Sequence, residues 1–132
     1  MPDPSFQSKY FQLAEFTCRC GCGQTLIDQD FVAKLDWLRE ELNRPLIITS
    51  GYRCPKHNQA VSSSGPDGPH TTGQAADIKL YGLAAYNTMY LAKTIGFTGL
   101  GISQKGPQTS RYLHLDTLAG GPGRPRPWIW SY

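Results

Sequence analysis

The chain has 132 residues, of which 39% are hydrophobic and 17% are charged, and its formal net charge is +3 at pH 7. This length is typical of one domain with one sizeable core, so a second domain is not expected. The modest positive charge is spread along the chain, which excludes the clustered basic footprint of a nucleic-acid-binding protein.

The N-terminal segment carries no export signal. Residues 1–10 lack the basic region and apolar run of a secretory signal peptide. The sequence also contains no stretch close to the roughly eighteen apolar residues of a membrane span. We therefore expect a chain that is made in the cytoplasm and has no contact with a membrane.

Cysteines alternate near the N-terminus, at Cys18, Cys20 and Cys22, and a fourth cysteine is Cys54. This spacing is tighter than in a usual structural zinc knuckle, where two or more residues separate each ligand pair. In a strand, Cys20 would also point away from its two neighbours. Two interpretations stay open: a second metal site, or free or disulfide-bonded thiols that tie this segment to Cys54. A cytosolic origin favours reduced thiols.

Two longer segments show helical periodicity. Asp28 can cap a helix that runs to about Leu42, where apolar residues recur at helical spacing and Pro45 stops the helix. A second helix is predicted from about Leu83 to Ile95, with Gly96 as its terminator. The residues expected to be buried in this second helix are Tyr86, Tyr90, Leu91 and Ile95. Both helices are expected to pack on the apolar face of a sheet.

Arg53 follows an apolar strand predicted over residues 45–49, after the turn Ser50-Gly51-Tyr52. A planar guanidinium binds a carboxylate through two parallel hydrogen bonds, which suits a substrate that carries a carboxylate. The alternative is a surface arginine paired with an acid. A short helix opened by Pro55 follows and carries His57, which could contact the site or lie in solvent.

Two later segments are predicted as strands with one polar face each. In residues 75–80, Asp77 lies opposite the apolar positions, and in residues 111–116, His114 and Asp116 share the polar face. If both strands lie in one sheet, these polar faces converge. His70 can reach them from the Gly- and Pro-rich loop that precedes it. Two imidazoles and one carboxylate leave a fourth position open for water, which is the pattern of a catalytic zinc site.

Three ordered motifs resemble the M15-type zinc peptidases of peptidoglycan, which are D-Ala-D-Ala carboxypeptidases and endopeptidases that share a fold with the hedgehog signalling domain. The motifs are Ser50–Asn58, His70–Ile78, and Leu113–Asp116 followed by Arg124–Trp128. The resemblance covers about residues 11–128. It implies an α+β fold with a small, mainly antiparallel sheet, helices on one face and zinc on the other. It also implies Zn²⁺ held by His70, Asp77 and His114, with Arg53 near the substrate.

One position departs from the family pattern. Many members carry a carboxylate three residues before the last histidine ligand, which acts as general base, whereas this chain has Arg111. Arginine stays protonated and cannot accept a proton from water. The subgroup with a His-x-Asp ending, which this chain most resembles, also often lacks that carboxylate. Asp116 is then the nearest candidate for the base, and its alternative role is to orient the ring of His114. Asp67 is a further candidate for the base, and His57 is expected to act structurally or indirectly.

The resemblance implies a single zinc peptidase domain over residues 1–132, with a cysteine-containing extension over residues 1–26 packed on it. The expected function is hydrolysis of a peptide bond in peptidoglycan stem or crosslink peptides, as a DD-carboxypeptidase or an endopeptidase. The alternative is a non-catalytic zinc-containing domain that binds the wall or builds a phage tail, which Arg111 favours.

The expected partner is a peptidoglycan peptide, with no nucleic acid and no membrane, and the chain is expected to be a monomer. A wall enzyme without an export signal suggests a phage or prophage product that acts at the cell wall, or a mature chain. The end of the sequence, residues 124–132, is expected to be irregular, with its tryptophans in the core or in a groove wall.

Overall fold

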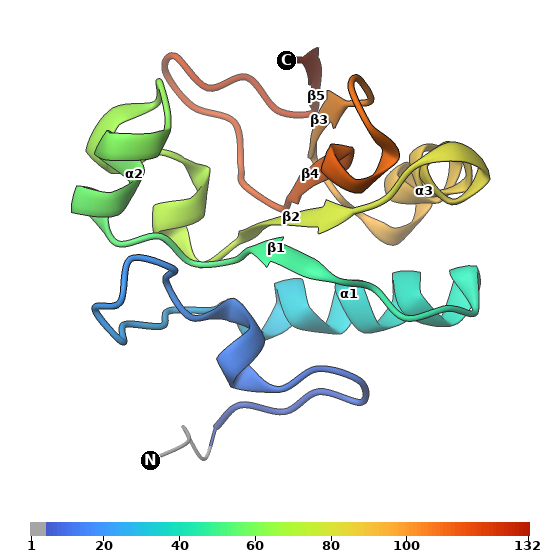
Figure 1. Ribbon diagram of the computed structural model, residues 1–132, viewed down its shortest axis with the longest axis horizontal. Coiled ribbons are helices and arrows are strands. Elements are labelled where there is room, and N and C mark those ends of the chain that lie inside the picture. Colours follow the sequence, from blue (N-terminus) through green and yellow to red (C-terminus); the bar gives the residue numbers. More distant parts are fainter. Residues whose placement is uncertain (1–4) are drawn as a thin grey trace.

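The computed structural model describes residues 5–132 (Figure 1). Its helices and strands are, in chain order, η1 (Leu13–Phe16), α1 (Gln29–Leu42), β1 (Ile48–Ser50), α2 (Pro55–Val61), η2 (Gly65–Asp67), η3 (Pro69–Thr72), β2 (Ala75–Lys79), α3 (Gly82–Ile95), β3 (Gly99–Ser103), η4 (Gln108–Ser110), β4 (Tyr112–Asp116) and β5 (Trp128–Ser131). Within the described residues, the strands form a five-stranded sheet of order β1-β2-β4-β3-β5. Every neighbouring pair is antiparallel except β3 and β5. The expected α+β fold with a mainly antiparallel sheet is confirmed.

One face of the sheet carries the hydrophobic core. The core joins Phe31 of α1 and Ala85 of α3 to Ile78 of β2 and Leu113 of β4, all of them buried. In Figure 1, α1 lies along one side of β1 and β2, whereas α2 and the chain between β4 and β5 lie on the other side. The alternation of side chains along a strand therefore places the polar residues of β2 and β4 on the face away from this core.

The first helix begins and ends as its sequence predicts. The Asp28 carboxylate accepts a hydrogen bond from the backbone N–H of Phe31 at 2.9 Å, as an N-cap residue does. The helix ends at Leu42, and Asn43 adopts the left-handed conformation with φ 51°. Asn tolerates this conformation better than most residues, so the chain can turn here towards β1.

The prediction for the buried face of α3 is wrong for two residues. Tyr86 and Tyr90 are 73% and 81% exposed. The buried residues of α3 are Ala85, Thr88, Ala92 and Ile95. These four recur at intervals of three and four, so they form one helix face, and three of them are small enough to let α3 pack closely. Ile95 and the terminator Gly96, with φ 108°, agree with the prediction.

The end of the C-terminal segment forms the strand β5, contrary to the expectation that all of residues 124–132 are irregular, whereas residues 125–127 are irregular as expected. β5 pairs in parallel with β3, and Gly101 lies opposite Trp130. A Cβ atom on Gly101 would lie 2.7 Å from Trp130 Cε2, so glycine leaves the space that the indole occupies. The pairing links segments that the sequence separates widely, and local periodicity does not reveal it. It makes β5 an edge of the sheet.

The described part of the expected N-terminal extension packs on the same core. Phe11 and Phe16 are buried there, with ring centroids 5.6 Å apart. The backbone N–H of Tyr52 donates to the Phe16 carbonyl at 2.9 Å. Residues 1–4 of this extension lie outside the described residues. Among the helices of residues 5–132, none combines the length and apolar character needed to cross a membrane.

Candidate metal centre

Three buried side chains converge on the polar face of the sheet. Asp77 lies opposite His114 in the pairing of β2 with β4, and η3 brings His70 beside them. His70 Nε2 and His114 Nδ1 are 3.3 Å apart. Asp77 Oδ1 lies 3.3 Å from His70 Nε2 and 3.2 Å from His114 Nδ1. The structure therefore brings together the three residues that the sequence predicts as ligands.

The outer nitrogen of each ring has its own partner. His70 Nδ1 lies 2.8 Å from the Gly51 carbonyl oxygen, and His114 Nε2 lies 2.7 Å from Asp116 Oδ2. Because these partners are acceptors, the outer nitrogens carry the protons and the inner nitrogens present lone pairs. Three acceptor atoms then face one another, and a cation between them removes their repulsion.

The separations also suit a metal ion. A tetrahedral zinc ion with bonds of about 2.0–2.1 Å spaces its nitrogen and oxygen ligands about 3.3 Å apart. The observed separations are 3.2–3.3 Å. The Asp77 carboxylate is buried, but Arg53 Nη2 donates to its Oδ2 at 3.1 Å, and an opposite charge this close favours the ionised form. The carboxylate is therefore available as an anionic ligand at neutral pH.

Asp116 lies behind His114, on the side of the ring away from the other two ligands. It is fully buried and accepts hydrogen bonds from Arg126, Nε to Oδ1 at 3.0 Å and Nη2 to Oδ2 at 2.9 Å. Burial would raise the pKa of Asp116, but hydrogen bonds from His114 and Arg126 outweigh it and lower the pKa to about 2. Of the two roles that the sequence leaves open, this geometry favours orienting His114 over taking a proton from water.

Gly99 makes room for the Asp116 carboxylate. The two residues lie opposite each other in β3 and β4, and a Cβ atom on Gly99 would lie 2.2 Å from Asp116 Oδ1. We expect Gly99→Ala to lower the free energy of unfolding by about 1–3 kcal/mol, because it overpacks a buried site. Chemical denaturation measures the change. Gly121→Ala is the matched control, since its Cβ would meet nothing within 4 Å. Equal stability of the two variants would contradict this account.

Arg53 is anchored beside Asp77. Its Nη2 donates to Asp77 Oδ2 at 3.1 Å, its Nε donates to Ser50 Oγ at 2.9 Å, and its Nη1 donates to Asn58 Oδ1 at 3.2 Å. Arg53 thus holds the Asp77 oxygen that does not face the histidines. Asn58, which is fully buried, also donates to Ser64 Oγ at 2.9 Å and joins α2 to the following loop. Sequence reasoning missed Asn58, although it ends the motif that contains Arg53.

A cavity of about 390 Å³ opens beside the three ligands. It is lined by Arg53, Val61, Ser62, Ser63, Ser64, Pro69, His70, Asp77, Tyr112, His114, Trp130 and Tyr132. The ring of Trp130 lies 5.0 Å from that of His114, so the expectation of a groove-wall tryptophan holds for this residue. Burial raises the pKa of Tyr112 and of Tyr132, so both hydroxyls stay protonated as hydrogen-bond donors.

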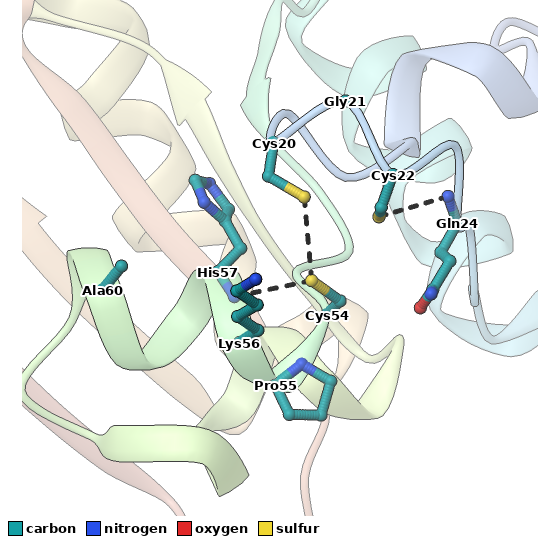
Figure 2. A pocket seen from close by; sticks show the side chains of 9 residues that line it. All are labelled: Cys20, Gly21, Cys22, Gln24, Cys54, Pro55, Lys56, His57 and Ala60. Atoms are coloured by element: carbon teal, nitrogen blue, oxygen red, sulfur yellow. Dashed lines mark hydrogen bonds between the residues drawn. The ribbon is translucent and has the colours of Figure 1, made fainter.

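Other residues that the sequence singles out lie elsewhere. Arg111 Nε donates to the Gly106 carbonyl at 3.0 Å. Asp67 is exposed and lines a neighbouring groove. His57 lines a separate pocket with Cys20 and Cys54 (Figure 2), and it is not among the residues that line the cavity beside the three metal ligands.

The comparison with known families agrees with this geometry. A family model described as Peptidase M15 matches residues 9–116, a segment that contains all three predicted ligands and Arg53. A comparison with curated proteins gives no match. This family is typically metal-dependent, in agreement with the arrangement of His70, Asp77 and His114. Because the match covers most of the sequence, the chain belongs to the peptidase M15 family.

Proposed function

We propose that this chain is a zinc-dependent peptidase that hydrolyses a peptide bond in peptidoglycan stem or crosslink peptides, as a DD-carboxypeptidase or an endopeptidase. The observation that carries the proposal is the cluster of His70, Asp77 and His114 at the wall of a cavity of about 390 Å³. Membership of a peptidase family supports hydrolysis. Two imidazoles and one carboxylate are a donor set that suits catalytic zinc.

His70, Asp77 and His114 would hold the ion. A bound zinc ion lowers the pKa of water at its open position and polarises the scissile carbonyl. The chain's own residues fix this arrangement, since Asp116 orients the ring of His114 and Arg53 holds the second oxygen of Asp77. Rigid placement of this kind lowers the cost of reaching the transition state.

The cavity offers matching contacts for a peptide substrate. Arg53 lies in its wall with a side chain that is 15% exposed, so its remaining N–H groups can bind a carboxylate or the developing oxyanion. The protonated hydroxyls of Tyr112 and Tyr132 can donate to a peptide carbonyl, and Trp130 offers an apolar surface. These contacts suit a short peptide with a carboxylate near the scissile amide. On the family resemblance, we further propose a monomer of phage or prophage origin that acts at the bacterial wall.

Digestion of purified peptidoglycan tests this function and identifies the bond. We expect new peptide termini by mass spectrometry, their loss in the presence of a chelator, and their return when Zn²⁺ is added. Released D-alanine would indicate a carboxypeptidase, and new termini within crosslinks would indicate an endopeptidase. Intact peptidoglycan with the zinc-loaded protein would contradict the proposal.

A specific observation favours a second candidate, a non-catalytic wall-binding or phage tail domain. Position 111 is an arginine, and the two carboxylates of the described chain that lie at the metal centre, Asp77 and Asp116, are both engaged by hydrogen bonds. In this case the zinc-loaded protein would sediment with peptidoglycan and leave it uncut. The digestion experiment, with a sedimentation assay beside it, separates the two candidates.

Arg53→Lys tests the proposed role of the guanidinium. Lysine keeps the charge but cannot reproduce three directed hydrogen bonds, so we expect kcat/KM to fall about tenfold or more, since one hydrogen bond to a charged group contributes roughly 1.5–3 kcal/mol. Metal content should largely persist, because His70, Asp77 and His114 remain. Arg111→Lys is the matched control, as Arg111 is outside the cavity lining. Unchanged kcat/KM in Arg53→Lys would show that the guanidinium does not bind the substrate or stabilise the oxyanion.

A further inference from the structure

A second group of metal-ligating side chains lies apart from the candidate metal centre. The Sγ atoms of Cys18, Cys20, Cys22 and Cys54 all lie within 4.8 Å of one another, and all four cysteines are free thiols. Cys20 Sγ lies 3.5 Å from Cys18 Sγ and 3.8 Å from Cys54 Sγ. A tetrahedral zinc ion with bonds of about 2.3 Å to sulfur spaces its ligands about 3.8 Å apart. The two separations from Cys20 Sγ are close to this value, and all other pairs lie within 4.8 Å, so the four thiols are near enough to share one ion.

The backbone explains how such closely spaced cysteines can converge. The expectation that Cys20 points away from its neighbours assumes an extended strand, but residues 19–22 form a turn. Gly21 and Gly23 have φ values of 92° and 75°, a conformation that glycine adopts readily. The backbone N–H of Cys18 donates to the Gln24 carbonyl at 2.9 Å and closes the loop.

Backbone N–H groups point at three of the sulfur atoms. The N–H of Cys54 donates to Cys18 Sγ, that of Gln24 to Cys22 Sγ, and that of His57 to Cys54 Sγ, each at 3.4 Å. Figure 2 shows the contacts to Cys22 and Cys54, with Cys20 turned towards Cys54. Such contacts hold the sulfur atoms in place, as the hydrogen-bond partners of metal-binding side chains do.

We propose that Cys18, Cys20, Cys22 and Cys54 bind a zinc ion as a tetrathiolate site, in addition to the ion of the candidate metal centre. Four protein ligands leave no open position, so the site is structural rather than catalytic. The thiol protons pass to solvent on binding, and no electron is transferred. Cys20 and Cys22 are exposed, which gives the ion a path of entry, whereas Cys18 and Cys54 are buried.

The cluster brings together two segments that are far apart in the sequence. The ion would join the N-terminal segment to the chain just after Arg53, beside the backbone hydrogen bond from Tyr52 to Phe16. The site would thus hold in place the segment that presents Arg53.

Reconstitution of the full chain with Co²⁺ tests the proposal, because thiolate ligands give cobalt a charge-transfer absorption that imidazole and carboxylate ligands do not give. We expect this absorption in the wild type and in His114→Ala, which lacks a ligand of the other centre. The double variant Cys20→Ser/Cys22→Ser should lose the absorption and one equivalent of metal. Both substituted residues are exposed, so the fold is expected to persist, and circular dichroism checks it.

A second measurement uses the wild type alone. A chelator should accelerate the labelling of the cysteines by a thiol reagent about tenfold or more, since metal-bound thiolates are shielded. Rapid labelling without chelator, with no charge-transfer absorption, would overturn the proposal in favour of free thiols. An intact mass lower by two hydrogens would overturn it in favour of a disulfide. These outcomes are independent of peptidase activity.

Discussion

His114→Ala should remove the metal ion from the candidate metal centre and abolish peptidase activity. The variant loses one of three ligands, and it leaves the buried pair of Asp116 and Arg126 facing an empty space. We expect turnover to fall at least about a hundredfold, because removal of one group that stabilises charge in a transition state usually lowers kcat by that factor or more. Elemental analysis should find one equivalent of metal fewer than in the wild type.

His57→Ala is the matched control for this substitution. His57 lines the pocket beside the cysteines and not the cavity beside the metal ligands, so its variant should keep both the metal and the activity. If His114→Ala kept the full metal content of the wild type, the assignment of His114 as a ligand would be wrong. Loss of activity in both variants would point to a general effect on folding.

Asp116→Asn should weaken metal binding and spare the chemical step. The amide oxygen can still accept from His114 Nε2, but the negative charge that faces the imidazole and Arg126 is lost. We expect zinc affinity to fall about 10–100-fold, as for other partners of metal-bound histidines. Turnover at saturating zinc should stay close to that of the wild type. A general base would instead lose about a hundredfold or more in turnover with zinc fully bound.

Arg126→Lys tests the same carboxylate through its second partner, since Arg126 also donates to Asp116. It replaces two directed hydrogen bonds to Asp116 by one point charge, so zinc affinity should fall less than in Asp116→Asn, with turnover retained. If Asp116→Asn instead loses turnover at saturating zinc while Arg126→Lys does not, Asp116 takes part in proton transfer after all.

The expected convergence of His70, Asp77 and His114 is confirmed, and strand alternation together with the resemblance of three motifs to a known family predicts it. Alternation along a strand places Asp77 and His114 on polar faces, and the pairing of β2 with β4 sets the two residues opposite each other. His70 follows because a Gly- and Pro-rich loop leads to it. The helix that Asp28 caps and that ends at Leu42 can be predicted from neighbouring residues alone, because its N-cap and its apolar spacing lie within one short segment.

Other features depend on contacts between distant segments, which periodicity does not contain. Residues 124–132 look irregular until β3 offers a parallel partner, so the sequence does not reveal that Trp130 reaches His114. The buried face of α3 consists mainly of small residues. Tyr86 and Tyr90 are large and partly apolar, so the sequence suggests that they are buried, but both are exposed. The grouping of the cysteines depends on two glycines with positive φ, which spacing rules for strands do not anticipate.

Two parts of the chain line the cavity beside the metal ligands, and β5 is one of them. The ligands lie within the segment matched by the family model, residues 9–116, whereas Trp130 and Tyr132 come from beyond it. Exchange of residues 127–132 would therefore change the part of the cavity lining that Trp130 and Tyr132 provide, while His70, Asp77 and His114 stay in the sequence. Grafts of this length that retain Arg126 therefore offer a way to change the contacts that a peptide substrate makes in the cavity.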